Sequence, residues 1–218
     1  MLIFDIETVA HPQAEALIGT PKAPANYRDP VKIATYVAEK AADELEHAPL
    51  DADLCTVRAI GARMITKSGS TIGAFEQDVV KIVGVDGTEE EIVREYWVTF
   101  AGQGGRCCGY NILGFDLPVL LRRSFAMNID VPLPPSLARY RIGPVYDLYA
   151  ILYNWGPGRG LKWVAERYGL EVEAPGVDGS QVAGMTNDEL RVYMRSELKL
   201  LDQLYHRMKS VYWGQWAG

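Results

Sequence analysis

The chain opens with the sequence MLIFDIETVA, in which an apolar run leads directly into two carboxylates on alternate residues. The composition of Leu2–Ile6 predicts a short strand that is buried on both faces, as strands of parallel sheets are. Side chains two positions apart on a strand point to the same face, so we expect Asp5 and Glu7 to lie together. Two adjacent carboxylates repel each other, and one pKa is raised, unless a cation lies between them. Mg²⁺, which takes oxygen ligands and accepts one or two protein carboxylates, is such a cation.

Segments typical of strands and of helices are mixed along the rest of the chain, with no internal repeat and no linker. This mixture indicates an α/β fold with a single domain over residues 1–218. Turn signals at 67–70 and 85–88 predict that part of the sheet is antiparallel. We expect strands at 2–6, 56–65, 79–85 and 106–110. We expect helices at 31–46, 89–100, 115–125, 145–153 and 161–168, and loops at 11–27 and 131–135.

The last predicted helix is the best defined element of the sequence. Thr186 followed by Glu189 forms a T-x-x-E capping box, which predicts where this helix begins. Apolar residues then continue at helical spacing as far as Met208. Tyr193 and Glu197 stand four residues apart on this helix and therefore share a face.

A further acid stands where a strand is followed by a helix, in the segment GYNILGFDLPVL at 109–120. Asp116 falls in the first turn of that helix, where an acid complements the helix dipole. Asn111 is a residue type common in turns. Taken singly, each of these residues is more simply explained by local structure than by a site. The D-x-E pair likewise fits a strand end with solvated acids, so only the ordered set of motifs indicates a function.

The composition argues against several other classes of protein. Three cysteines without a C-x-x-C pair predict neither a zinc site nor a disulfide framework, and we expect them to be small buried side chains. No apolar stretch reaches the length of about 20 residues that a membrane span needs, so we expect a cytoplasmic protein with no membrane association. The formal net charge of −6 argues against a protein held on nucleic acid by bulk charge. It does not exclude a nuclease, because an acidic metal site contributes negative charge of its own.

Taken in order, these motifs resemble those of the DEDD superfamily of 3′–5′ exonucleases, which have the ribonuclease H-like fold. The segment FDIET at 4–8 matches the first family motif, and GYN at 109–111 with FD at 115–116 matches the second. The chain is most similar to the DEDDy branch, which includes the proofreading domain of family B DNA polymerases and stand-alone, often phage-borne, relatives. The resemblance extends from Phe4 to about Tyr205 and implies a central mixed β-sheet flanked by helices. Residues 147–148, 161–165 and 178–182 resemble connecting segments of the phage-type relatives.

The third motif departs from the family pattern Y-x-x-x-D, because Glu197 stands where the family has Asp. Asp202 comes nine residues after Tyr193, and at about 100° per residue it is expected to face away from that side chain. The longer side chain of Glu197 moves its carboxylate by about an ångström, which Mg²⁺ should tolerate least because it demands octahedral geometry. The histidine branch of the superfamily is disfavoured, since no histidine stands five residues before an acid on the last helix.

The resemblance implies a two-metal mechanism with Mg²⁺ or Mn²⁺ as the cofactor. In such a site Asp5 bridges the two ions, Glu7 and Glu197 complete the first position, Asp116 supports the second, and Tyr193 positions the attacking water. The residues expected to contact the substrate are Ile6, Thr8, Asn111 and Phe115. For Phe115, packing in the core is an equally good interpretation. The candidate phosphate contacts are Arg122, Arg123, Arg139, Arg141, Arg159 and Lys162.

We therefore expect an exonuclease acting on 3′ ends of single-stranded DNA. Three alternatives stay open at this point. The first is a catalytically impaired relative that binds DNA ends or a replication protein, which the Glu at position 197 suggests. The second is a 3′–5′ exoribonuclease, since contacts to the 2′-hydroxyl decide between RNA and DNA. The third is a ribonuclease H-like endonuclease. Because the motifs fill the chain, a polymerase or another replication protein would be a partner in trans. If the protein is phage-encoded, its location is the host cytoplasm.

Overall fold

A computed structural model describes residues 1–65 and 78–213 of the chain. Its sheet consists of β1 (Leu2–Ala10), β2 (Cys55–Met64), β3 (Val79–Ile82), β4 (Cys107–Gly109) and β5 (Val145–Asp147). The spatial order is β3-β2-β1-β4-β5. Strands β3, β2 and β1 pair antiparallel, whereas β1, β4 and β5 pair parallel. The mixed sheet and the antiparallel part expected from the sequence are therefore confirmed.

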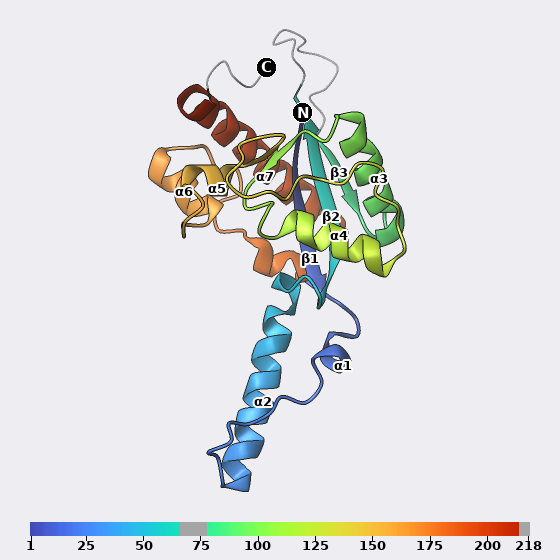
Figure 1. Ribbon diagram of the computed structural model, residues 1–218, viewed down its shortest axis with the longest axis vertical. Helices are drawn as coiled ribbons and strands as arrows, with labels where there is room; N and C mark the ends of the chain where they lie inside the picture. Colours follow the sequence, from blue (N-terminus) through green and yellow to red (C-terminus); the bar gives the residue numbers. More distant parts are fainter. Residues whose placement is uncertain (66–77, 214–218) are drawn as a thin grey trace.

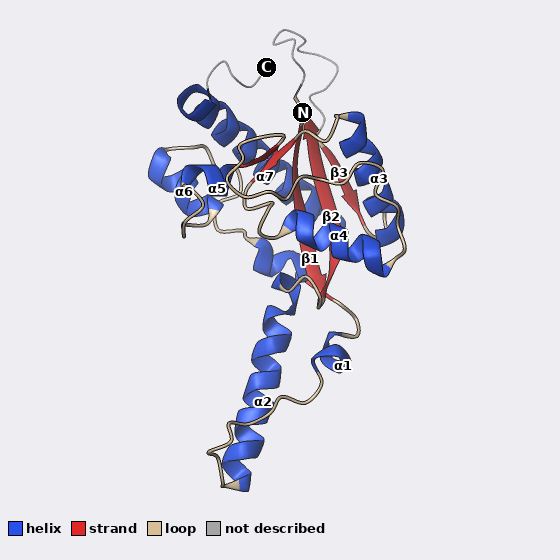
Figure 2. Ribbon diagram, in the orientation of Figure 1, coloured by secondary structure: helices blue, strands red, loops and turns tan. Residues whose placement is uncertain are grey.

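Helices cover both faces of this sheet (Figure 1, Figure 2). The helices are α1 (Ala14–Ile18), α2 (Pro30–His47), α3 (Glu89–Gly102), α4 (Asp116–Ala126), α5 (Leu148–Leu152), α6 (Leu161–Tyr168) and α7 (Asn187–Met208). Short helical turns are present at η1 (Ala48–Leu50), η2 (Gly179–Gly184) and η3 (Lys209–Trp213). The capping box at Thr186 is present and begins α7 one residue later, as predicted. Among the described residues, no helix is long and apolar enough to cross a membrane.

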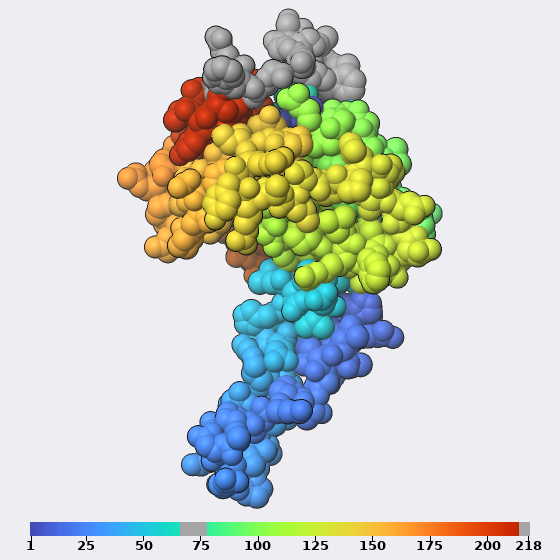
Figure 3. Space-filling view, viewed as in Figure 1, coloured from blue at the N-terminus to red at the C-terminus, as the bar shows by residue number. Residues whose placement is uncertain are grey.

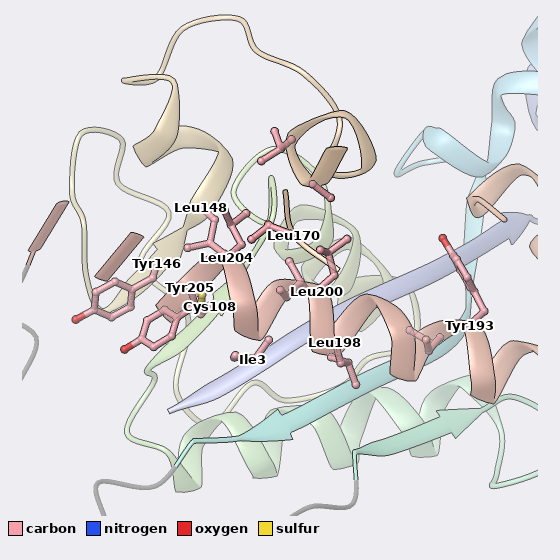
Figure 4. Close-up of a cluster of buried hydrophobic side chains, with 14 of the residues drawn as sticks. Ile3, Cys108, Tyr146, Leu148, Leu170, Tyr193, Leu198, Leu200, Leu204 and Tyr205 are labelled. Atoms are coloured by element: carbon pink, nitrogen blue, oxygen red, sulfur yellow. The ribbon is translucent and has the colours of Figure 1, made fainter. Parts of the chain in front are cut away.

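Alternate residues of β1 belong to two different cores. Leu2 and Phe4 are fully buried in the core that includes Trp97 of α3 and Leu120 of α4. Ile3 points to the opposite face and packs in the core built on α7 (Figure 4). Because side chains two apart on a strand share a face, the residues that follow Ile3 at alternate positions also point towards α7.

Strand β1 is longer than the strand beside it. Strand β4 pairs only with Leu2 and Ile3, whereas β1 continues along β2 as far as Ala10. The sequence prediction ended the strand at Ile6 and was therefore too short, because pairing with β2 extends the strand beyond the apolar run. The acids lie within β1, along an edge that β4 leaves unpaired.

The residues between β1 and β2 form an arm that projects from the body of the molecule (Figure 3). No residue of α2 is buried. Asp29 precedes the helix and caps it, because its side chain accepts a hydrogen bond from the Val31 N–H. This start, with Pro30 in the first turn, confirms the predicted helix. The segment 11–27, predicted as a loop, contains the short helix α1.

One predicted helix was wrong over its first three residues. Residues 145–153 were expected to be helical throughout, but Val145–Asp147 is a buried strand that pairs with β4, and the helix α5 begins only at Leu148. The neighbouring strand, which sequence periodicity does not reveal, overrides the local preference. The three cysteines are free and buried, as expected. The predicted turn at 67–70 lies outside the described residues.

Replacing Gly109 tests the packing of β4 against β1. A Cβ at Gly109 would lie 2.7 Å from the Phe4 carbonyl oxygen and would also collide with the Ile112 side chain. Because a paired strand cannot easily move aside, Gly109→Ala is expected to lower the free energy of unfolding by about 1–3 kcal/mol in chemical denaturation. The control is Gly102→Ala at the end of α3, where a Cβ meets nothing within 4 Å and no loss is expected. Equal stability of the two variants would contradict the described packing.

Candidate active site

The unpaired edge of β1 is closed by a side chain from α4. The Ile6 N–H, which has no strand partner on that side, donates a hydrogen bond to Asp116 Oδ1 at 3.2 Å. Asp116 is buried in the first turn of α4, so the start of the helix fixes its position. The carboxylate thus takes the place of a neighbouring strand and lies next to β1 where Asp5 and Glu7 stand.

Helix α7, which packs against β1, brings Tyr193 and Glu197 to this strand. Glu7 and Glu197 are 9% and 5% exposed, which is unusual for acids. Burial raises the pKa of Glu7, and the nearby Tyr193 hydroxyl offsets part of this rise. Figure 4 shows Tyr193 at the end of α7 that approaches the far end of β1. Asp202 lies elsewhere, where it forms ion pairs with Arg63 and His206 on the α7 surface.

A lysine lies among these acids. Lys162, on α6, donates a hydrogen bond to the Glu197 carboxylate, and its Nζ is 5.3 Å from the centroid of the Tyr193 ring. Burial raises the pKa of Glu7 and of Glu197, and the Lys162 ammonium offsets part of this rise. The sequence analysis placed Lys162 among the candidate phosphate contacts, whereas in the structure it contacts Glu197 of the third motif. Only the fold could reveal this, since the two residues are 35 positions apart.

The carboxylates are close enough to perturb one another. Removal from solvent is the main cause that raises the pKa of Asp5 well above its usual range, and the charges of Asp116, Glu7 and Glu197 raise it further. Burial, with Glu197 and Asp116, raises the pKa of Glu7 to about 8. Burial also raises the pKa of Asp116 to about 7. The charges of the other three acids all act on Asp5, which lines the same cleft as Asp116.

A carboxylate that the sequence analysis did not single out holds the loop between β4 and α4. Asp147, at the end of β5, accepts hydrogen bonds from the backbone N–H groups of Asn111 at 3.0 Å and Leu113 at 2.9 Å. It also accepts from the Ala150 N–H at 3.1 Å and so caps α5. Asn111 adopts a left-handed backbone conformation with φ of 61°, which Asn tolerates better than most residues. An acid directly after a buried apolar pair was the available signal, but that segment was interpreted as a helix.

A cleft of about 550 Å³ opens between η1, the start of α4 and the α5–α6 loop. The predicted residues in its walls are Asp5, Ile6, Asn111, Phe115 and Asp116. Leu50, Tyr110, Tyr149 and Arg159 also line it and were not predicted to form a cleft. Glu7 and Glu197 are not in these walls, and Tyr193 lines a separate hollow of about 670 Å³.

Thr8 differs from the other residues of the first motif. Its side chain is buried, and its hydroxyl donates a hydrogen bond to the Pro49 carbonyl oxygen at 2.5 Å. The structure therefore uses Thr8 to attach η1, and with it the base of the arm, to β1. Leu50, the next residue of η1, is 70% exposed and forms part of the cleft wall.

The chemistry of the side chains fits a divalent cation. Four acids with pKa values raised by burial, Asp5, Glu7, Asp116 and Glu197, form the cluster, and Lys162 is the cation that offsets part of this rise for Asp5, Glu7 and Glu197. Such oxygen donors are what Mg²⁺ and Mn²⁺ prefer. Among the described residues, no three His, Cys, Asp or Glu side chains are arranged so that they hold a metal ion as they stand. The donor set supports a metal, while the Glu197 carboxylate is turned towards Lys162.

A mixed α/β sheet with carboxylates gathered around its central strand is consistent with the ribonuclease H-like fold. Residues 50–196 match a protein family described as "Predicted 3'-5' exonuclease related to the exonuclease domain of PolB". The chain belongs to this family. The match begins after Asp5 and Glu7 and ends one residue before Glu197, so the placement of these acids comes from the structure.

A solved polymerase has a similar fold. The family B DNA polymerase from the hyperthermophilic archaeon Pyrobaculum calidifontis matches with a TM-score of 0.55 and 19% sequence identity. The likeness covers 95% of this chain but only 24% of the polymerase chain. At this identity the likeness establishes the fold, which is consistent with the ribonuclease H-like fold predicted from the motifs. No curated protein matched the chain.

The raised pKa values predict how stability depends on pH without metal. A carboxyl that binds its proton more tightly when folded stabilises the protein below its unfolded pKa of about 4, and this stabilisation is lost as the pH rises through the folded value. For Glu7 and Asp116, with folded pKa values of about 8 and 7, the loss should extend from about pH 4 to pH 8. In EDTA, the melting temperature should fall over this range, and it should fall less for Asp5→Asn.

Asp202→Asn provides the matched control for this measurement, because Asp202 lies on α7 but pairs with Arg63 outside the cluster. Its melting temperature should follow the same pH dependence as the wild type. If Asp5→Asn and Asp202→Asn show equal pH dependence, the carboxylates do not repel one another as described.

Proposed function

We propose that the protein is a divalent-metal-dependent exonuclease that removes nucleotides from the 3′ end of single-stranded DNA. The observation that carries the proposal is the convergence of Asp5, Glu7, Asp116 and Glu197 on the unpaired edge of β1, beside Tyr193. Buried acids that raise each other's pKa are unfavourable for folding alone, so a function accounts for them better than stability does.

We assign the holding of the cations to the four carboxylates, with Asp5 at the centre. Cations held there would supply a Lewis acid that activates water and stabilises the leaving 3′-oxygen in phosphodiester hydrolysis. Burial raises the pKa of Tyr193 well above its usual range, so its phenol stays neutral. We assign to Tyr193 the orientation of a water molecule by hydrogen bonding.

The aromatic walls of the cleft suit bases of any sequence. Phe115 both packs against the core and lines the cleft, so the two interpretations of this residue hold together. Tyr110 and Tyr149 also line the cleft and stand edge to face, with ring centroids 5.5 Å apart. Stacking on aromatic rings tolerates every base, which an enzyme that trims ends one nucleotide at a time requires.

The ion pair between Lys162 and Glu197 favours a second candidate function. In the structure the ammonium engages the carboxylate that the proposed metal site needs. If this pair persists when cations are present, one ligand is lost and cleavage is weakened. The protein would then bind 3′ ends, or a replication partner such as a polymerase in trans, without efficient hydrolysis.

Digestion of 5′-labelled single-stranded DNA in Mg²⁺, Mn²⁺ or EDTA tests the proposal. We expect a ladder that shortens from the 3′ end with metal and no digestion in EDTA. Loss of an outer-shell partner of a metal site costs about 10–100-fold in activity, so Asp5→Ala should lose at least about 100-fold. Asp202→Ala, which removes an acid of α7 outside the cluster, should digest at the wild-type rate.

The other outcomes separate the alternatives. Digestion with Mn²⁺ alone would indicate that Glu197 distorts the site for Mg²⁺, which demands near-ideal geometry. DNA binding without digestion in either metal would favour the second candidate. Internal cuts in place of a ladder would indicate an endonuclease, and digestion of RNA but not DNA would indicate an exoribonuclease.

A further inference from the structure

The basic residues that the sequence predicts as phosphate contacts divide into two groups. Three of the predicted phosphate contacts are engaged with acids: Arg123 with Glu89, Arg122 with Asp53, and Lys162 with Glu197. The other three, Arg139, Arg141 and Arg159, form no ion pair with any described residue and are exposed. Their guanidinium groups are not engaged by a carboxylate of the described residues. They are therefore the best candidates for contacts with phosphate.

Arg159 connects this second group to the cleft. It lines the same cleft as Asp5 and Asp116. Its guanidinium lies 5.7 Å from the ring centroid of Trp163, a tryptophan that is 44% exposed in the first turn of α6. An exposed tryptophan with an arginine over its face offers stacking and positive charge at one place.

Two tyrosines of the cleft hold the loop that carries Arg159. The Tyr110 hydroxyl donates a hydrogen bond to the Arg159 carbonyl oxygen. The Tyr149 hydroxyl accepts a hydrogen bond from the Gly158 N–H at 2.7 Å. The loop between α5 and α6 is therefore fastened to the cleft wall, and the Arg159 side chain starts from a fixed backbone.

The same loop carries a second aromatic pair. Trp155 packs against Tyr140 with ring centroids 5.4 Å apart, and Tyr140 is 74% exposed. Both residues have left-handed backbone conformations, with φ of 58° and 62°, which large side chains rarely adopt. Arg139 and Arg141 flank Tyr140 in the sequence. Strained residues of this kind cluster at binding sites.

We propose that Arg159, Trp163, Trp155 and Tyr140 form a surface that holds a single strand of nucleic acid upstream of its 3′ end. We call these four residues the strand-binding surface. The inference rests on the proposed function, since it takes the 3′ end to lie at Asp5. The bases stack on the exposed rings, and the arginines neutralise phosphates of the strand. Stacking of this kind changes affinity by about 5- to 150-fold per base and is independent of sequence.

The chain offers a matched control on α6 itself. Tyr168 is 46% exposed at the far end of this helix, and the Arg167 guanidinium lies 5.9 Å from its ring centroid. This arginine–aromatic pair has the same chemistry as Arg159 with Trp163 but is not part of the cleft. Tyr140→Ala with Trp163→Ala removes two exposed rings of the strand-binding surface, and Tyr168→Ala removes one exposed ring elsewhere.

Kinetics on a 20-nucleotide oligo-dT and on the dinucleotide dTpdT test the surface. The double variant should raise the KM for the 20-mer by about tenfold or more with kcat unchanged, because upstream bases lose their stacking partners. The dinucleotide has no upstream strand, so its cleavage should be unchanged. Tyr168→Ala should match the wild type on both. A 20-nucleotide oligo-U run in parallel shows whether the surface holds RNA as well, and loss of affinity on either polymer supports the proposal.

Binding measured without metal separates this inference from the proposed function. Fluorescence anisotropy of a 5′-labelled 20-mer in EDTA requires no cleavage, and the double variant should bind about tenfold or more weakly than Tyr168→Ala. If the wild type cleaves DNA but the double variant has an unchanged KM and affinity, the surface is refuted and the function stands. If the wild type cleaves nothing, the function fails, and the anisotropy still decides the surface.

Discussion

The repulsion between carboxylates gathered on one strand is the constraint on which the rest of the structure depends. Burial raises the pKa of Asp5, and the charges of three other acids raise it further. The fold maintains this arrangement through the pairing of β1. One edge of β1 pairs with β2 along its whole length, whereas on the other edge the pairing with β4 ends at Ile3. The gap that remains is filled by Asp116, which accepts the free N–H of Ile6. A sheet with a longer β4 would have no place for this carboxylate.

The elements around this gap serve mainly to fix its walls. Asp147 holds the loop that leads to Asp116, and Thr8 attaches η1 to β1 so that Leu50 reaches the cleft. Lys162 brings a positive charge to the cluster. This charge is paired with the carboxylate of Glu197, whose side chain is longer than the Asp of the family motif. The replacement of Asp by Glu in the third motif and the position of this lysine are therefore parts of one question, namely whether a metal or an ammonium neutralises the acids.

Much of this organisation could be predicted from the sequence, because its signals are local. The capping box at Thr186, the phase of Tyr193 and Glu197 on one helix face, and the shared face of Asp5 and Glu7 follow from side-chain spacing alone. The strand at 145–147 was missed because short strands in parallel sheets are defined by their neighbours and not by periodicity. The ion pair of Lys162 and the roles of Asp147 and Thr8 depend on contacts across the fold, which no spacing reveals.

Binding of Mn²⁺, followed by the loss of the free-ion signal in electron paramagnetic resonance, tests the central claim most directly. The wild-type protein is predicted to bind Mn²⁺ at pH 8, because the ion relieves the repulsion around Asp5, and Asp5→Asn is predicted to bind at least about 10-fold more weakly. Asp202→Asn should bind as the wild type does, since Asp202 pairs with Arg63 outside the cluster. Equal Mn²⁺ binding by wild type and Asp5→Asn, or no binding by the wild type, would contradict the claim that these carboxylates form a metal site.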